Sequence, residues 1–231
     1  MRFEVVLENL GLYLDGLWTT VWLVAAALAL GLLLAVPAGL ARTSRNPAIN
    51  FPAWLFTYFF RGTPLLVQLF LIYYGAGQFA TIRESVLWPL LSQAWFCALL
   101  AFTLNTAAYT AEIIRGAVIA TPVGEIEAAR ACGMTPVLMY RRIVLPSAFR
   151  RALPAYGNEV IFMLHGSAIA SVVTIVDLTG AARIVNSRYY TPYEAFLTAA
   201  AFYLVLTFAI VWLFRLLERR WFAHLRPRSE G

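Results

Sequence analysis

The stretch Leu17–Ala41, LWTTVWLVAAALALGLLLAVPAGLA, decides the fold class of this chain because it contains no charged residue. A second uncharged run extends from Ser85 to Ala111. Crossing the hydrocarbon core of a bilayer takes about 20 apolar residues of helix, and both runs exceed that length. The whole chain is 61% hydrophobic and only 13% charged, about half the charged fraction of a typical soluble domain. These features predict a polytopic membrane protein.

The hydropathy pattern outside the first run predicts five transmembrane helices in a single domain, residues 1–231. The spans are expected at about 17–41, 62–80, 86–111, 152–176 and 195–214. All are expected to be helices, since an open strand edge leaves backbone groups without partners in lipid. The aromatic residues 51–60 either lie at the membrane interface or extend the second span, and the pattern leaves this open. The predicted fold class is therefore all-α.

The orientation of the chain follows from its arginines, because it has no lysine. An odd number of spans places the two termini on opposite sides of the membrane. With the C-terminus inside, the inner segments hold fourteen arginines, and the outer segments hold four, Arg2, Arg83, Arg183 and Arg188. Basic residues concentrate in cytoplasmic loops. We therefore expect the N-terminus outside and the C-terminus in the cytoplasm.

Several classes of protein do not fit these features. The net charge of +6 is explained by topology, and no solvated basic domain is present to bind nucleic acid. Cys97 lies in an apolar helix and Cys132 in a predicted cytoplasmic loop, so neither a disulfide nor a metal site is supported. The chain also lacks the G-x-S-x-G, H-E-x-x-H and G-x-x-x-x-G-K-[ST] motifs of catalytic and phosphate-binding sites. We expect a non-catalytic chain that binds no metal and no cofactor.

The inner segment at about 120–147 carries a spaced motif. Glu127-Ala128-Ala129 is followed by three residues, Gly133, nine residues, and Ile143-Val144-Leu145-Pro146. This resembles, at every fixed position, the EAA loop of ABC-importer permeases. We expect Gly133 to end the first of two short helices as a left-handed cap. The resemblance implies the type I ABC-importer permease fold, in which this helix pair docks into a cytoplasmic ATPase. It also implies the coupling residues Glu127, Ala128, Ala129, Gly133, Ile143, Leu145 and Pro146.

Two further segments narrow the family. Arg61–Gln68, RGTPLLVQ, and Leu104–Ile113, LNTAAYTAEI, resemble signatures of the polar amino-acid (histidine/glutamine) permeases. In the fourth predicted span, NEV at 158–160 and MLH at 163–165 resemble the M-type subunit of histidine/lysine/arginine/ornithine importers and the related opine importers. Many members of the group carry Lys-x-Thr-Ser-Leu where this chain has HGSAI at 165–169. That departure weakens any transfer of glutamine specificity.

The resemblance implies a bacterial inner-membrane permease that imports basic amino acids, with opines or other polar amino acids as the alternative. Its implied partners are a second homologous permease in a heterodimer, an ATPase dimer that binds ATP and Mg²⁺, an external amino-acid-binding protein, and membrane lipid. An ion-driven secondary transporter is the competing class. It would normally show more spans, inverted repeats and interrupted helices, none of which is apparent in the sequence.

Polar residues inside the predicted spans are the candidates for substrate binding. A carboxylate at the depth of Glu159 costs at least about 2–3 kcal/mol to insert, so such groups are normally paired, hydrated or functional. We expect Glu159 to contact a substrate cation, or else to pair with Arg61 or with an arginine of the companion subunit, or to be a protonated buried acid. The other candidates are Asn158, Asn105, Tyr109 and His165. For Asn105 and Tyr109 we favour interhelical hydrogen bonding, and for His165 a neutral, hydrogen-bonded side chain. We expect Glu112 to pair with Arg115.

Overall fold

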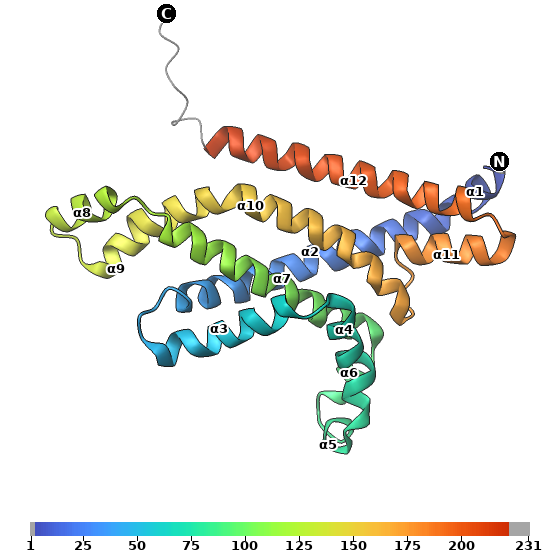
Figure 1. The fold of residues 1–231 in the computed structure, drawn as a ribbon. Coiled ribbons are helices and arrows are strands. Elements are labelled where there is room, and N and C mark those ends of the chain that lie inside the picture. Colours follow the sequence, from blue (N-terminus) through green and yellow to red (C-terminus); the bar gives the residue numbers. More distant parts are fainter. Residues whose placement is uncertain (1–2, 222–231) are drawn as a thin grey trace, which may run out of the picture.

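The computed structural model describes residues 3–221, and it is helical along most of that range without a strand. The all-α class is confirmed. The elements are α1 (Glu4–Glu8), α2 (Leu10–Ala41), α3 (Pro47–Gly62), α4 (Leu65–Phe70), η1 (Leu71–Gly75), η2 (Ala76–Gln78), α5 (Ala80–Arg83), α6 (Trp88–Leu91), α7 (Ala94–Ile119), α8 (Val123–Ala131), α9 (Pro136–Met139), η3 (Tyr140–Val144), α10 (Leu145–Gly166), η4 (Ser167–Val173), α11 (Leu178–Tyr189) and α12 (Pro192–Trp221). Figure 1 shows α2, α7, α10 and α12 running alongside one another, with α4 to α6 projecting from them.

The number of membrane spans depends on how two bent helix pairs are counted. Among the described residues, α2, α7 and α12 are each long and apolar enough to cross a membrane. The bent pairs, 47–62 with 65–78 and 136–173 with 178–189, raise that number to five if each is one span. The spans expected at 17–41 and 195–214 fall within α2 and α12.

The chain around the second expected span, 62–80, does not form one straight helix. It begins in α3 at Pro47 and turns by 105° after Gly62. Thr63 is extended, with φ −117° and ψ 143°, because a residue before proline is disfavoured in the helical region. The aromatic residues 51–60 therefore belong to α3, a helix that precedes the turn.

The third and fourth spans also differ from their expected bounds. Residues 86–93 precede α7, which begins at Ala94 and continues to Ile119. The fourth span leaves regular α-helix at Gly166, tightens into η4 and ends at Thr174, whose φ is 67°. The helix α11, which follows this bend, is absent from the five expected spans. Its mixed polar composition kept it below the hydropathy of a span.

Small residues bring α2 and α7 into close contact. Gly31 and Gly39 on α2 are buried, and a Cβ added at Gly31 would lie 2.5 Å from Thr106 Cγ2 of α7. At Gly39 the added Cβ would lie 2.8 Å from the carbonyl oxygen of Ala111. Glycine at helix crossings in membranes allows the two backbones to approach. These contacts set the position of α7, which carries much of the candidate site.

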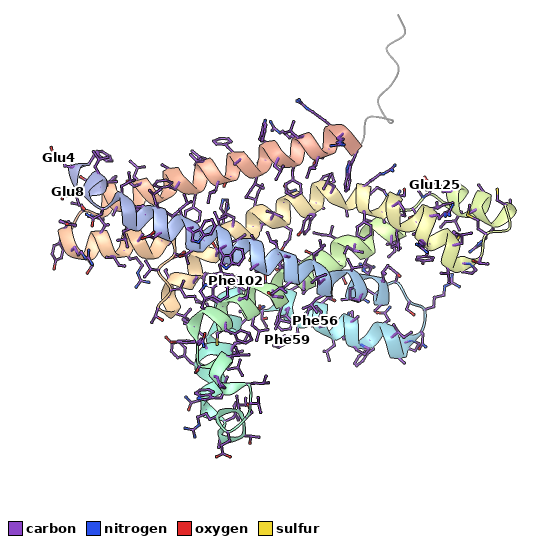
Figure 2. All side chains as sticks on the ribbon, turned by 180° about the vertical axis from the view of Figure 1, so that it is seen from behind. Glu4, Glu8, Phe56, Phe59, Phe102 and Glu125 are labelled. Atoms are coloured by element: carbon purple, nitrogen blue, oxygen red, sulfur yellow. The ribbon has the colours of Figure 1, made fainter. Side chains whose placement is uncertain are left out.

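The predicted coupling segment lies at one end of the molecule. Figure 2 shows Glu125 of α8 at the end opposite to Glu4 and Glu8 of α1. Two short helices, α8 and α9, form as expected, and α9 continues through the π-type turn η3 into α10. The chain therefore places its N-terminal helix and its coupling segment at opposite ends of the helix bundle.

Candidate functional site

A cavity of about 620 Å³ opens between α7 and α10, within the size range of small-molecule sites in proteins. Most of its wall is apolar. The lining residues, which come from α4, α7, α10 and η4, are Leu65, Asn105, Tyr109, Ile113, Ala155, Asn158, Glu159, Phe162, Met163, Gly166 and Ile169. Four of the five predicted substrate-binding residues are therefore brought together around one cavity. The i, i+4 spacing of Asn105 and Tyr109 places them on one face of α7, and the packing of α7 beside α10 brings Asn158 and Glu159 to the same cavity.

Among the residues that the structure describes, Glu159 is the one acidic residue that lines the cavity. Its side chain is buried, and its Oε1 accepts a hydrogen bond of 2.9 Å from Thr106 Oγ1 of α7. Within residues 3–221 the ion pairs closer than 4 Å are Arg42–Glu112 and Arg115–Glu112. Arg61 makes no such contact with Glu159, but it lies close enough for its charge to act on the carboxylate. The sequence pattern gave no sign of Thr106, because its role depends on the packing of α7 against α10.

Asn105 forms the interhelical hydrogen bonds that were favoured for it. Its Nδ2 donates to Gln68 Oε1 at 3.1 Å and to the carbonyl of Phe60 at 3.2 Å. Gln68 in turn donates from Nε2 to the carbonyls of Phe60 and Thr63, at 2.8 and 2.9 Å. These bonds satisfy carbonyls left free where α3 ends, so Asn105 and Gln68 together hold the 105° turn in place.

Tyr109 and Asn158, the other polar residues of the wall, are more exposed than Asn105 and Glu159. The Tyr109 hydroxyl donates to the carbonyl of Arg61 at 3.4 Å, and the Arg61 guanidinium carbon lies 5.3 Å from the centre of the Tyr109 ring. That distance allows a cation–π contact. Asn158 and Phe162 on α10 line the cavity and are exposed. The turn after α3 and the face of α10 thus border the same space.

His165 is not in the wall of this cavity. Its Nε2 lies 3.1 Å from Thr207 Oγ1 of α12, within hydrogen-bonding distance. The side chain therefore contacts the helix on the other side of α10. This geometry fits the prediction of a hydrogen-bonded His165 better than the prediction that His165 binds substrate in the cavity.

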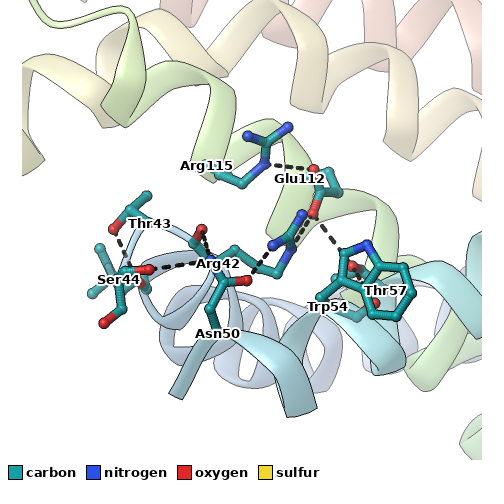
Figure 3. Close-up of polar contacts among 9 residues, drawn as sticks. Arg42, Thr43, Ser44, Asn50, Trp54, Thr57, Glu112 and Arg115 are labelled. Atoms are coloured by element: carbon teal, nitrogen blue, oxygen red, sulfur yellow. Dashed lines mark hydrogen bonds and ion pairs between the residues drawn. The ribbon is translucent and has the colours of Figure 1, made fainter. Parts of the chain in front are cut away.

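Glu112 is held by two arginines. Arg115 Nε donates to Oε2 at 2.6 Å, which confirms the expected pair one turn along α7. Arg42 Nε, at the end of α2, donates to Oε1 at 2.8 Å, and Thr57 Oγ1 of α3 donates to the same oxygen at 3.3 Å. Asn50 accepts from Arg42 and caps the turn between α2 and α3 (Figure 3). The network joins α2, α3 and α7, and its two long-range partners could not be read from sequence.

The coupling segment has the cap geometry that its glycine predicted. Gly133 has φ +71° and follows α8. Its amide donates to the carbonyl of Arg130 at 2.9 Å, and the amide of Met134 donates to that of Ala129 at 3.1 Å. This pair of bonds is the Schellman motif. Ala129 is buried while Glu127 and Ala128 are exposed, so part of the motif lies on the surface of this chain. Of the second half of the motif, Ile143 and Leu145 are half-buried and Pro146 is exposed.

Comparisons with known proteins agree with these features. Residues 17–223 match the family of binding-protein-dependent transport system inner membrane components. The chain is 45% identical to the nopaline transport system permease protein NocM of Agrobacterium fabrum, over 100% of this chain and 96% of that protein. It is 48% identical to the histidine/lysine/arginine/ornithine transport system permease protein HisM of Salmonella typhimurium, over 94% and 93% of the two chains.

The solved structures agree in fold. The crystal structure of an amino acid ABC transporter with histidines has a TM-score of 0.86 and 37% identity, covering 95% of this chain and 99% of that chain. An inward-facing MetNI methionine ABC transporter has a TM-score of 0.76 at 21% identity, covering 91% and 96%, and supports the fold alone. The resemblance drawn from the three sequence motifs is thus confirmed. The chain belongs to the family of binding-protein-dependent transport system inner membrane components, the membrane-spanning permeases of ABC importers.

Proposed function

We propose that this chain imports basic amino acids or their derivatives as one permease subunit of an ABC importer, and that the cavity between α7 and α10 lies on the translocation path. The observation that carries this proposal is Glu159, a buried carboxylate in a mostly apolar wall with no basic group within 4 Å in residues 3–221. A cation that enters a poorly hydrated cavity loses several kcal/mol of hydration, which an uncharged wall cannot replace. A carboxylate can replace this lost hydration through charge-assisted hydrogen bonds.

The names of the relatives support a cationic substrate without choosing one. HisM serves histidine, lysine, arginine and ornithine, and NocM serves nopaline. The first name supports basic amino acids as the cargo, and the second supports opines. Basic amino acids are our first assignment, and opines are the second.

The assembly follows from what this chain lacks in its sequence. It has no phosphate-binding loop, so a separate ATPase dimer would bind ATP and Mg²⁺ and hydrolyse the nucleotide. The spans of this chain are too few to enclose a gated path alone, so a second permease would complete the path as a heterodimer. An external binding protein would deliver the substrate. The N-terminus would lie outside and the C-terminus in the cytoplasm, as the arginine distribution indicates.

Glu159→Gln tests the role of the charge while it keeps the shape of the side chain. In vesicles that contain the whole importer, we expect uptake of arginine and lysine to fall strongly while assembly and basal ATP hydrolysis stay near wild type. Histidine uptake above neutral pH should fall less, because most of its side chains are then uncharged. Glu84→Gln makes the same chemical change at an exposed site remote from the cavity and serves as the control. Equal losses for charged and neutral substrates would indicate a structural role, and unchanged arginine uptake would remove Glu159 from the path.

Glu127→Lys tests docking of the ATPase. The side chain is exposed on α8, so charge reversal should leave membrane insertion intact while uptake and co-purification of the ATPase are lost. Normal uptake at normal membrane levels would count against the docking role.

A further inference from the structure

Arg151, near the start of α10, joins the two ends of the coupling segment. Its guanidinium donates from Nε to the carbonyl of Ala117 at 3.2 Å, from Nη1 to Ser147 Oγ at 2.7 Å, and from Nη2 to Thr121 Oγ1 at 2.7 Å. Ala117 lies in the last turns of α7, and Thr121 is in the turn just before α8. Ser147 lies in the first turn of α10, after the segment has returned through α9 and η3. One side chain therefore contacts both the beginning and the end of the segment 120–147.

We propose that Arg151 is a positioning residue for energy coupling: it fastens the coupling segment to α7 and α10, so that movement of α8 displaces both walls of the cavity. This inference rests on the proposed function. The two helices that Arg151 connects are those that supply the polar wall, Asn105 and Tyr109 from α7 and Asn158 and Glu159 from α10.

The partners of Arg151 show that geometry, more than charge, is what the site uses. All three acceptors are neutral, and neither of the ion pairs in residues 3–221 involves Arg151. A guanidinium is a rigid planar fork that can serve several fixed acceptors at once, whereas an ammonium is a single flexible point charge. Thr121 is buried, and its Oγ1 also donates to the carbonyl of Val118 at 2.8 Å. The acceptor on the exit side is therefore itself held to α7.

Apolar contacts alone do not provide this direction-specific link. Ala129 of α8 and Met139 of α9 pack in the same apolar cluster as Val118 of α7 and Ala148 of α10. Such packing brings the elements together but permits sliding, because apolar attraction is non-directional. Hydrogen bonds to three fixed acceptors define one arrangement of the helix ends, and that arrangement would transmit a displacement of α8.

The test measures ATP hydrolysed per molecule of substrate transported, with the reconstituted importer and its loaded binding protein. A variant that only destabilises the complex lowers both rates together and leaves this ratio unchanged. We expect Arg151→Ala to raise the ratio by about five- to tenfold, a typical size for a coupling free energy between sites. Arg151→Lys should give an intermediate ratio, and Thr121→Val, which removes one acceptor, a smaller rise. Arg150→Ala removes the same charge from the exposed neighbouring side chain and should keep the wild-type ratio.

The outcomes separate this inference from the function on which it rests. A wild-type ratio in assembled Arg151→Ala would overturn the inference while the proposed function stands. If Arg151→Ala does not assemble, wild-type ratios in both Thr121→Val and Arg151→Lys would overturn it. A rise in Arg150→Ala equal to that in Arg151→Ala would show an effect of charge and would also overturn it. Absence of substrate-stimulated ATP hydrolysis in the wild type, for every basic amino acid and opine, would instead defeat the proposed function.

Discussion

Thr106 Oγ1 on α7 lies 2.9 Å from Glu159 Oε1 on α10 and donates a hydrogen bond to it. The bond crosses between the two helices that form the cavity and fixes one oxygen of the carboxylate. Thr106 is itself pressed against Gly31 of α2. The orientation of the candidate cation-binding group therefore depends on three helices, one of which, α2, does not line the cavity.

Thr106→Val should weaken transport of arginine, but less than Glu159→Gln. Valine keeps the volume of threonine and removes the donor, and a hydrogen bond to a charged group contributes about 1.5–3 kcal/mol. Uptake assays that separate KM from maximal rate would measure the change, which we expect mainly in KM. Thr103→Val is the matched control, because Thr103 Oγ1 is buried on the same helix and has no hydrogen-bond partner among the described residues. Equal effects of the two substitutions would contradict a specific role for Thr106.

Gly31→Ala should destabilise the permease through the same contact. The new Cβ would lie 2.5 Å from Thr106 Cγ2, so either the threonine or the helix must shift, and overpacking of this kind costs about 1–3 kcal/mol. A fall in the melting temperature of the purified complex would show it. Gly11→Ala, in the same helix with nothing within 4 Å of the added Cβ, should keep or slightly raise that temperature. Equal melting temperatures for Gly31→Ala and Gly11→Ala would contradict a tight contact between Gly31 and Thr106.

Glu112→Gln should also lower thermal stability, by about 1–3 kcal/mol in free energy of unfolding. Arg42 and Arg115 donate to the two oxygens of the Glu112 carboxylate. The glutamine amide has one oxygen and no charge, so it cannot neutralise the two arginines. Arg42→Gln should cost more than Arg115→Gln, because the Arg42 side chain is 14% exposed against 35% for Arg115 and links α2 to α7. Melting temperatures of the three variants provide the measurement. The reverse order for the two arginines would show that the local pair within α7 dominates.

Gly133→Val should abolish transport while the protein remains inserted in the membrane. A side chain at φ +71° is strained by about 1–2 kcal/mol, and more for a β-branched residue. The space around Gly133 is open, with nothing within 4 Å of an added Cβ, so packing would not explain the loss. Gly133→Asn, which tolerates the left-handed region, should retain much of the uptake. If the Gly133→Val and Gly133→Asn variants take up substrate equally well, the cap has no role in coupling.

A reporter fused after Gly231 should be cytoplasmic, and one inserted near Glu84 should be external. The arginine distribution predicts this orientation, although Arg2, Arg226 and Arg228 of that count lie outside the described residues. Paired reporters active on opposite sides of the membrane provide the measurement. Reversed signals at both sites would invert the proposed topology.

Much of the candidate site followed from local periodicity. Asn105 and Tyr109 are one helical turn apart, so their shared face was predictable. The cap at Gly133 was also predictable, since it depends on bonds within a few residues. Neither Thr106 nor Arg151 could be identified in this way, because their partners lie on helices far away in the sequence. The substrate-binding and coupling roles of all these residues stay predictions until they are measured.

By itself, the sequence determined the membrane setting, the family and the position of the coupling segment, because apolar length and motif spacing are properties of neighbouring residues. Tertiary structure helped to decide that the chain turns by 105° after Gly62, since Asn105 from another helix holds the turn together with the local residues Pro64 and Gln68. It also decided that His165 contacts Thr207 of α12 and not the cavity. The side to which a helical residue points depends on which helices pack around it, and in a membrane that packing arises from close fit and interhelical hydrogen bonds, which hydropathy does not record.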